Sequence, residues 1–376
     1  MSTLEVITDT ARFMALEQEW NALAERFPTP LLRHEWFVAC FKAYGENKEL
    51  AVFTVREDGA LRAAAPFVAD RDAFVPKLMA LGHETTEPHA FIYADETALQ
   101  ALARGILDYR LPLVMPRLRA GGPELQAFAT VTGWRGKWFL NESDSATSAV
   151  PLDADFAAFE ARMHRTERSN MRRRRKLAER DGPVTTEVVT PTPADVHQHL
   201  RAVYEVEGRS WKTRAGTAIL CDQRLENFCN EYGAKAAQMG ILRIFYLRVG
   251  ATPVAVGMIL QYAGRLWGLK QGYDEQWSPC APSILLAHDS FRYGCEHGLQ
   301  AYEFLGAAEK FQSRWPLELT AYSRARYYPF SLLSLAAICI DALLMPVNKL
   351  KRLRRSKSGS LSEFIRPGGA ESVNSA

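Results

Sequence analysis

The chain has 376 residues, of which 47% are hydrophobic and 24% are charged, and its net charge is +3. This length leaves room for two domains of ordinary size, and the composition is typical of a soluble globular protein. The small net charge excludes bulk attraction to nucleic acid, and the longest apolar stretch, 330–345, is too short and too interrupted to span a membrane.

The cysteines and histidines predict neither disulfides nor a metal centre. Six cysteines are scattered along the chain, with no CxxC pair and no histidine at the spacing of metal ligands. The first residues lack a basic region followed by an apolar core, as a signal peptide would have. We therefore expect reduced thiols in a cytoplasmic protein without a metal.

The first part of the chain is expected to form an α/β unit. Helices are predicted over 11–26 and 34–44, and strands over 50–55 and 61–68 form a hairpin. Strand and helix signals continue to alternate after this hairpin, which favours a sheet covered by helices.

A cationic helix is predicted over 156–180, ended by Asp181-Gly182-Pro183. Arginines at 172–175 cover every side of one helical turn, so they cannot all contact one ligand. Most of them are expected to be solvated, with one or two reaching a phosphate of a nucleotide-linked or lipid-linked acceptor. We assign Arg172 and Arg175 to this role.

The segment that follows predicts two helices and a set of antiparallel strands. A strand over 184–189 precedes helices over 193–209 and 225–239. Strands over 242–249 and 253–262 then form a second hairpin.

The stretch from residue 266 onward is predicted to hold a binding site. A strand over 266–273 is followed by a loop of small residues, a helix over 284–297 and a strand over 301–305. Such a loop leaves backbone N–H groups pointing at one spot, where the helix dipole also favours an anion, and it is a seat for a pyrophosphate. A tight turn and helix cap would use the same residues, and the two interpretations are compatible. The residues assigned to this cradle are Trp277, Ser278, Pro279, Cys280, Ala281 and Ser283.

The order of short motifs from the arginine-rich helix to residue 316 resembles a known family. These motifs are Ser210-Trp211-Lys212, Leu247-Arg248-Val249-Gly250 with Pro253-Val254-Ala255, Gly272-Tyr273-Asp274, Trp277-Ser278-Pro279, Gly298 and Tyr302-Glu303-Phe304-Leu305. The family is the GNAT-like acetyltransferases associated with cellulose or exopolysaccharide biosynthesis, which are related to the Fem-type aminoacyl transferases.

The resemblance implies an α/β (α+β) fold with tandem GNAT-like domains, each a mixed, mostly antiparallel sheet flanked by helices. The expected limits are 1–155 for the first domain and 156–328 for the second, which would bind the acyl donor. The remainder, 329–376, is expected to be an apolar helix with a basic, partly disordered tail.

The same resemblance implies the chemistry. An acyl group would pass directly from acyl-CoA, such as acetyl-CoA, or from an acyl carrier protein to a small-molecule or glycan-precursor acceptor. No metal and no covalent enzyme intermediate would be needed.

Site residues follow from the resemblance and from residue chemistry. Glu309 is the first candidate for proton acceptance and Asp274 the second. The family usually ends this block with an acid, then Tyr-Lys, then Trp, and here Phe311-Gln312 replaces Tyr-Lys between Glu309 and Trp315. Each has a structural alternative: Glu309 would be an exposed loop residue, Asp274 would form a turn, and Trp211 would be buried. The residues assigned to the substrate are Trp211, Lys212, Tyr273, Gln312 and Trp315, together with the two arginines above.

Two other functions stay open. The chain would be a Fem-like transferase that uses aminoacyl-tRNA, or a non-catalytic GNAT-like component of a polysaccharide synthesis complex. Nucleic acid is disfavoured, because aromatic residues do not interleave with the arginines.

The end of the chain also has two interpretations. Six basic residues between 349 and 357 follow the apolar stretch. Either this is a packed helix with a solvated tail, or the segment 330–357 attaches the protein peripherally to the inner membrane.

Overall fold

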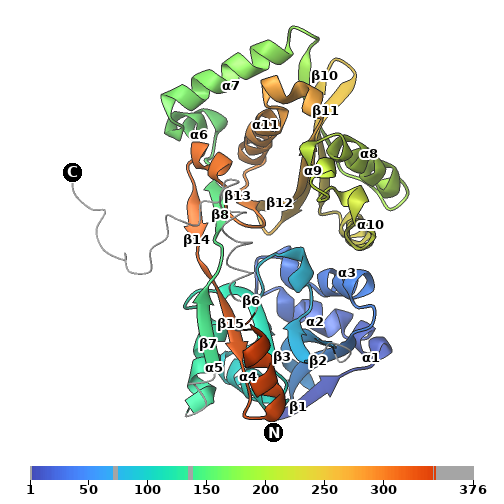
Figure 1. Ribbon diagram of the computed structural model, residues 1–376. Coiled ribbons are helices and arrows are strands. Elements are labelled where there is room, and N and C mark those ends of the chain that lie inside the picture. The colour runs from blue at the N-terminus through green and yellow to red at the C-terminus, as the bar shows by residue number, and fades with distance from the viewer. Residues whose placement is uncertain (1, 71–74, 134–138, 342, 344–376) are drawn as a thin grey trace, which may run out of the picture.

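Two sheets with their helices form the framework of the protein (Figure 1). The computed structural model describes residues 2–70, 75–133, 139–341 and 343. The basic residues 349–357 and the tail that follows lie outside this part of the chain. None of the described helices is both long enough and apolar enough to cross a bilayer.

The first sheet is built mostly from the N-terminal half. Its strands are, in spatial order, β1 (Ser2–Ile7), β2 (Glu49–Glu57), β3 (Ala60–Asp70), β4 (Lys77–Ala80), β6 (Leu113–Arg119), β15 (Tyr322–Tyr327) and β7 (Phe139–Ser143), with the short β5 (Ile92–Tyr93) beside β3. The helices of this half are α1 (Thr10–Met14), α2 (Glu17–Ala24), α3 (His34–Tyr44), α4 (Glu96–Asp108) and α5 (Pro123–Thr132).

The second sheet is built mostly from the C-terminal half. Its spatial order is β9 (Val184–Val189), β10 (Leu242–Val249), β11 (Thr252–Tyr262), β12 (Arg265–Tyr273), β13 (Ala301–Phe304), β8 (Thr147–Pro151) and β14 (Glu318–Thr320). Its helices are α6 (Phe156–Arg162), α7 (Arg165–Ala178), α8 (Val196–Gly208), α9 (Trp211–Arg214), α10 (Gln223–Gln238) and α11 (Pro282–Glu296).

The two sheets repeat one topology. In each, three antiparallel pairings are followed by one parallel pairing, β4 with β6 and β12 with β13, and then by two antiparallel pairings. A helix joins the parallel strands in both, α4 in the first sheet and α11 in the second. The sequence shows no close repeat, so this similarity lies in the fold alone.

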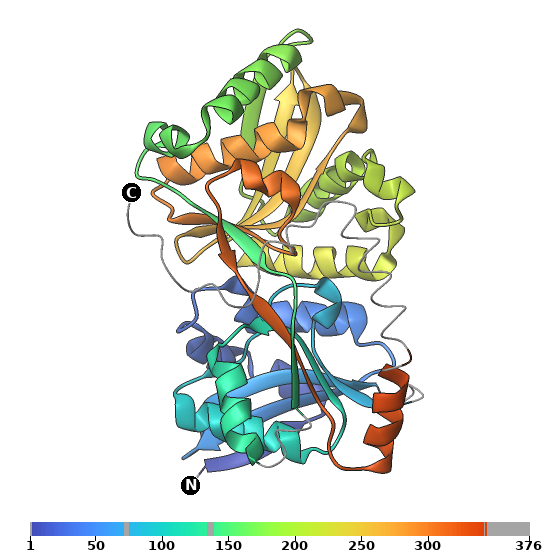
Figure 2. The ribbon, with the colours of Figure 1, turned by 60° about the vertical axis from the view of Figure 1, so that its left-hand side comes forward.

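The units exchange one strand each. β7 and β8 follow each other in the chain, yet β7 lies in the first sheet and β8 in the second. β14 and β15 cross in the opposite direction and pair with β8 and β7, so a two-stranded ribbon runs through both sheets (Figures 1 and 2). The domain limits expected at 155 and 328 stay a prediction, because each sheet contains a strand from beyond its own limit.

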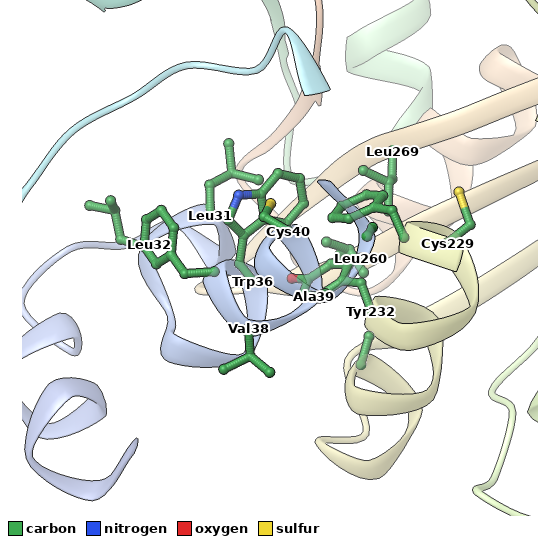
Figure 3. Close-up of a cluster of buried hydrophobic side chains, with 14 of the residues drawn as sticks. Leu31, Leu32, Trp36, Val38, Ala39, Cys40, Cys229, Tyr232, Leu260 and Leu269 are labelled. Atoms are coloured by element: carbon green, nitrogen blue, oxygen red, sulfur yellow. The ribbon is translucent and has the colours of Figure 1, made fainter. Parts of the chain in front are cut away.

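An apolar core joins the units. Trp36 of α3 contacts Phe228 and Tyr232 of α10, with ring centroids 5.0 and 4.9 Å apart. Figure 3 shows Trp36 and Cys40 of α3 beside Tyr232 of α10, and Cys229 belongs to the same core. Burial of these large side chains fixes one unit against the other, because the exposed surface of each would otherwise be strongly apolar.

Several expected elements differ in their limits. The helix expected over 156–180 is two helices, because Met163 is buried and extended while His164 caps α7 by accepting from Thr166 N–H at 3.3 Å. The helix expected over 11–26 is likewise divided into α1 and α2. The loop after β12 is a short 3₁₀ helix, η5 (Glu275–Cys280).

Candidate functional site

A cavity of about 550 Å³ opens where β12 and β13 diverge. The two strands pair from Arg265 with Ala301 to Gly268 with Phe304, whereas β12 continues to Tyr273. A bulge at Leu269 interrupts the pairing of β12 with β11 at the same level. The backbone of β12 therefore turns toward open space beyond Gly268, with α11 starting beside it.

Gln312 places hydrogen-bond donors in this cavity. Its side chain lies in η6 (Lys310–Arg314), lines the cavity and is 4% exposed. The Oε1 atom accepts from Glu309 N–H at 2.8 Å and from Ser148 Oγ at 2.7 Å. A backbone N–H can only donate, so the amide orientation is fixed and Nε2 must carry the two donors. No described protein group accepts from Nε2, so its donors are left for a ligand.

Glu309 lies at the junction of two openings. It lines the cavity at β12 and also a second hollow of about 670 Å³ that His164 and Glu167 border. The residue is exposed, yet partial burial of its carboxyl raises the pKa of Glu309 above its usual value, and nearby Lys212 opposes this rise. A carboxylate with a raised pKa is a better proton acceptor at neutral pH than an ordinary one.

Lys212 is held at the cavity wall by two bonds. Its Nζ donates to Glu207 Oε1 at 2.9 Å and to the carbonyl of Gln271 at 2.7 Å. Glu207 is buried, and its second oxygen accepts from Ile219 N–H at 2.9 Å. Gly272 makes room for Glu207, since a Cβ at residue 272 would lie 2.4 Å from the Glu207 Cγ.

The first unit completes the cavity through the loop 85–87. Glu87 Oε2 accepts from Gly306 N–H at 2.8 Å, and Arg117 Nη2 donates to the carbonyl of Gly306 at 2.7 Å. Burial raises the pKa of Glu87, against the opposing effects of Lys270, the Gly306 N–H and Arg117. The turn after β13 is therefore positioned by side chains from the other unit.

In the first unit, the place that corresponds to the cavity is occupied by residues of that unit. His89 N–H donates to the carbonyl of Arg117 at 3.0 Å, and Arg117 donates to the carbonyl of Thr86. The segment 86–89 thus lies alongside β6 where β4 has ended, whereas the same place in the second unit is the cavity. This difference leaves a site in the second unit.

Two cations, Lys270 and Arg314, line the cavity. Lys270 lines it and makes no ion pair with any described residue. Arg314 also lines it, and burial together with the charge of Arg174 lowers the pKa of Arg314. Glu167 is 3.8 Å from Arg314, and Arg174 Nη1 is buried without a partner among the described residues. The wall is therefore suited to an anionic ligand.

One residue of the predicted pyrophosphate cradle, Ser283 at the start of α11, lines the cavity. Pro282 has no N–H, and no described group accepts from the Ser283 N–H, so this donor is available. The five residues 277–281 do not line the cavity, because η5 winds them into a turn whose Trp277 and Ala281 N–H groups bond to Asp274 and Ser278 carbonyls. Of the six residues predicted to form the cradle, five therefore lie outside the cavity.

Asp274 is not brought to the cavity. It is 5% exposed, caps η5 by accepting from Gln276 N–H at 3.1 Å, and lies 3.4 Å from Arg209. This geometry gives Asp274 the turn-forming role that was the alternative, and we no longer assign it to catalysis.

The arginines predicted to bind substrate also lie elsewhere. Arg172 is exposed on the outer side of α7. Arg175 forms an ion pair with buried Asp289 of α11 at 2.5 Å, and Asp289 also accepts from Thr186 Oγ1 at 2.5 Å. Arg175 therefore joins α7 to α11, and Asp289 in turn bonds to β9, whereas Arg174 lies near Arg314.

The remaining predicted residues divide between cavity and core. Trp211, Lys212 and Tyr273 line the cavity, with Trp211 48% exposed at its edge. Trp315 is 4% exposed and packs on Phe291 with ring centroids 4.9 Å apart, so it is a core residue.

Sequence reasoning did not find Glu87, Lys270 or Arg314. Glu87 comes from the first unit, and no local pattern connects it to a site in the second. Lys270 stands in the predicted strand, but the bulge at Leu269 decides which side chain faces the cavity. Arg314 lies inside the segment from Glu309 to Trp315 that the sequence singled out, and it could have been included with Gln312.

Comparisons with known proteins agree with this geometry. Residues 165–313 match the family model described as an acetyltransferase (GNAT) domain. The whole chain is similar to the crystal structure of FemX, with a TM-score of 0.58 and 14% identity over 86% of this chain and 97% of that chain. No curated protein matches the chain.

Two further solved structures share the fold. One is the C-terminal domain of a putative lysylphosphatidylglycerol synthetase from Agrobacterium fabrum, with a TM-score of 0.54 and 12% identity over 89% of this chain and 97% of that chain. The other is L-PGS from Bacillus licheniformis, with a TM-score of 0.53 and 14% identity over 88% and 96%. The predicted pair of GNAT-like units is confirmed, and the GNAT domain makes the protein an acyltransferase.

Proposed function

We propose that the protein transfers an acyl group from acyl-CoA directly to an amine or hydroxyl of a sugar or of another envelope or exopolysaccharide precursor. One observation carries this proposal. The donors of Gln312 Nε2, the carboxylate of Glu309 and the start of α11 line a single cavity at the point where β12 and β13 separate.

The reaction needs one proton acceptor and one group that polarises the carbonyl. Glu309 takes the proton from the acceptor as its nitrogen or oxygen attacks the thioester carbon. Gln312 Nε2 donates to the carbonyl oxygen as negative charge develops there. The carbon–sulfur bond then breaks, and the thiolate leaves and is protonated. No step requires a covalent bond to the enzyme.

The anionic parts of the two substrates have partners in the same walls. The N–H of Ser283 and the unpaired Lys270 would bind phosphate groups of the donor. Arg314, which lines the second hollow with Glu309, and Arg174 near it would bind a phosphate of a nucleotide-linked or lipid-linked acceptor. An acyl carrier protein stays an alternative donor.

Gln312 supplies the test of the mechanism. Gln312→Glu keeps the oxygen that accepts from Glu309 N–H and Ser148 but removes the donors that face the cavity. We expect kcat to fall about a hundredfold or more, as for loss of an oxyanion donor. Ser148→Ala removes one support of Gln312 and keeps its donors, so it should cost about 1 kcal/mol of stability and leave most of the activity. Equal activity of Gln312→Glu and the wild type would contradict the mechanism.

A second candidate is transfer of an amino acid from aminoacyl-tRNA. The observation that favours it is the exposed cationic side of α7, where Arg165, Arg172 and Arg173 face solvent. A third hypothesis, a non-catalytic component, depended on the replacement of a family lysine by Gln312, and Gln312 retains donors in the cavity.

The melting temperature measured with different ligands distinguishes the candidate functions. A ligand that binds the folded protein raises its melting temperature. We expect stabilisation by acetyl-CoA or a longer acyl-CoA, and by nucleotide sugars as probes of the acceptor. Stabilisation by charged tRNA with none by any acyl-CoA would overturn the proposal in favour of the second candidate.

A further inference from the structure

The turn that leads to Glu309 is held by the first unit. Gly306 follows β13, and its φ of +82° is a left-handed conformation that glycine adopts without strain. Its N–H donates to Glu87 and its carbonyl accepts from Arg117. No described group of the second unit bonds to either backbone group of Gly306. The position of the turn therefore depends on Glu87 and Arg117, which we call the clamp.

The clamp belongs to a strained part of the first unit. Thr86 and Arg117 have φ values of +61° and +52°, which residues other than glycine rarely adopt. Arg117 donates to the carbonyl of Thr86 as well as to that of Gly306, and its guanidinium carbon lies 5.4 Å from the ring centroid of Tyr322. Strained backbone persists only where the surrounding structure over-determines it, and such positions cluster at functional sites. Here the two strained residues meet where the first unit reaches the second.

Both residues of the clamp are buried charged groups. Glu87 and Arg117 are 5% and 4% exposed. Burying an ionised carboxylate or guanidinium is costly, and apolar side chains would fill the same contact at lower cost. Charged groups, however, make shorter and stronger hydrogen bonds to backbone groups than neutral ones do. The clamp is therefore better suited to fixing the turn than to filling the interface.

The turn is connected to the proposed catalytic side chains by a short run of chain. Two alanines separate Gly306 from Glu309, and the second of them donates its N–H to the carbonyl of Ala146 at 2.7 Å. The Glu309 N–H in turn donates to Gln312 Oε1 at 2.8 Å. A displacement of the turn would therefore move the proposed base and the proposed donor to the carbonyl together.

We propose that Glu87 and Arg117 are positioning residues of the transfer reaction, which hold Glu309 and Gln312 in place through the turn at Gly306. The clamp would act through this turn and not on the reacting atoms. The inference rests on the proposed function for the roles of Glu309 and Gln312, whereas the hold on the turn does not depend on the identity of the substrates.

Hydrogen exchange of the full chain measures the clamp without a substrate. Glu87→Ala removes the acceptor of the Gly306 N–H, whereas Glu87→Gln keeps an acceptor oxygen and removes the charge. We expect exchange of the amides from 306 to 312 to accelerate about tenfold or more in Glu87→Ala, and much less in Glu87→Gln, because a bond to a charged group is lost in the first and largely replaced in the second. Arg117→Met, which leaves the Gly306 carbonyl without its donor, should act like Glu87→Ala. Exchange that stays unchanged in Glu87→Ala would overturn the proposal.

Glu124 offers a matched control within the first unit. It is also a 5% exposed glutamate that accepts a backbone N–H, from Phe91 at 3.4 Å, but this bond stays within one unit. Glu124→Ala should leave exchange from 306 to 312 as it is in the wild type. Equally fast exchange there in Glu124→Ala would indicate general loosening of the first unit and would contradict a specific role of Glu87.

Steady-state kinetics with acetyl-CoA and a nucleotide sugar measures the consequence for the reaction. We expect kcat of Glu87→Ala to fall about tenfold or more while KM for acetyl-CoA changes less than about threefold, since misplaced reacting groups cost rate and not donor binding. Glu87→Gln should restore most of the rate. An equal loss in both variants would overturn the proposal, because the charge of Glu87 and not its bond to Gly306 would then matter. Absence of turnover by the wild type with any acyl-CoA would refute the proposed function alone, and hydrogen exchange would still decide whether the clamp holds the turn.

Discussion

The proposed chemistry depends on three side chains around the cavity: Glu309, Gln312 and Lys212. Gln312 is fixed by two accepted hydrogen bonds and carries unused donors. Lys212 is held by Glu207 and still lowers the pKa of Glu309 by its charge. In the proposed mechanism, these three residues of one cavity would act as the base, the donor to the carbonyl and the cation that adjusts the base.

The pH dependence of activity should report Glu309. Only the deprotonated carboxylate accepts a proton, so activity is present above the raised pKa of Glu309 and is lost as pH falls through it. Lys212→Met removes the charge that opposes the rise, and the acid limb of kcat/KM should move to higher pH. Lys310→Met, which changes an exposed neighbouring charge, should leave the limb where it is. An acid limb that does not move in Lys212→Met would argue against Glu309 as the base.

Loss of the carboxylate itself should be severe. Glu309→Gln keeps the size of the side chain but cannot accept a proton, and kcat should fall about a hundredfold or more. Glu275→Gln, a glutamate outside the cavity on η5, is a control for general loss of negative charge. Equal loss in both variants would indicate a structural cause.

Arginines on α7 should differ in their effect on stability. Arg175→Met leaves buried Asp289 with the Thr186 hydroxyl and, at 3.9 Å, the His288 ring, and we expect a loss of about 2 kcal/mol in the free energy of unfolding. This is less than the roughly 3–5 kcal/mol for a fully buried pair, because a quarter of the Arg175 side chain is exposed. Arg172→Met, on the exposed side of the same helix, should change the free energy of unfolding by less than about 0.5 kcal/mol. Urea denaturation of the two variants measures the difference.

At the scale of elements, the site depends on how closely α8 packs on β12. The absence of a Cβ at Gly272 lets α8 bring Glu207 against the strand, and Glu207 in turn holds Lys212. The bulge in β12 and its early separation from β13 then direct the strand toward the cavity. Packing of one helix thus positions a side chain that belongs to another element.

Glycine substitutions test this packing. Gly272→Ala places a Cβ within 2.6 Å of the Cγ, Cβ and Cα atoms of Glu207, so the helix or the strand must move. We expect a loss of about 1–3 kcal/mol of stability, as for overpacking in a core. Gly208→Ala at the end of α8 meets nothing within 4 Å and should be neutral or stabilise the protein by up to about 1 kcal/mol. Thermal denaturation that ranks the two variants in the opposite order would contradict the packing argument.

At the scale of the whole molecule, two repeated units are joined by exchanged strands and a shared core. β8 contributes the buried Val150 to the second unit, while β15 contributes Ala325 to the first. The first unit also supplies Glu87 and Arg117 to the turn at Gly306. The first unit therefore helps to build the cavity of the second.

Two fragments test whether the second unit is bounded by the strands of its sheet or by the predicted limits 156–328. Residues 144–320 contain every strand of the second sheet, whereas 156–328 lack β8 and carry the foreign β15. We expect 144–320 to melt at a higher temperature, because removing β8 exposes the edge of β13 and leaves Val150 out of the core. Circular dichroism melts compare the two fragments. Equal melting would mean that the exchanged strand contributes little.

The sequence by itself determined the features that depend on neighbouring residues. These are most strands and helices of the second unit, the start of α11, and the segment from Glu309 to Trp315. Local patterns of apolar residues, caps and turns suffice for these. The tertiary structure alone decided the exchange of β8 and β15, the ion pair of Arg175 with Asp289, and the contact of Glu87 with the turn at Gly306. Each of these depends on a partner far away in the chain, such as Asp289 for Arg175 or Gly306 for Glu87, and such pairings leave no periodic signal in the sequence.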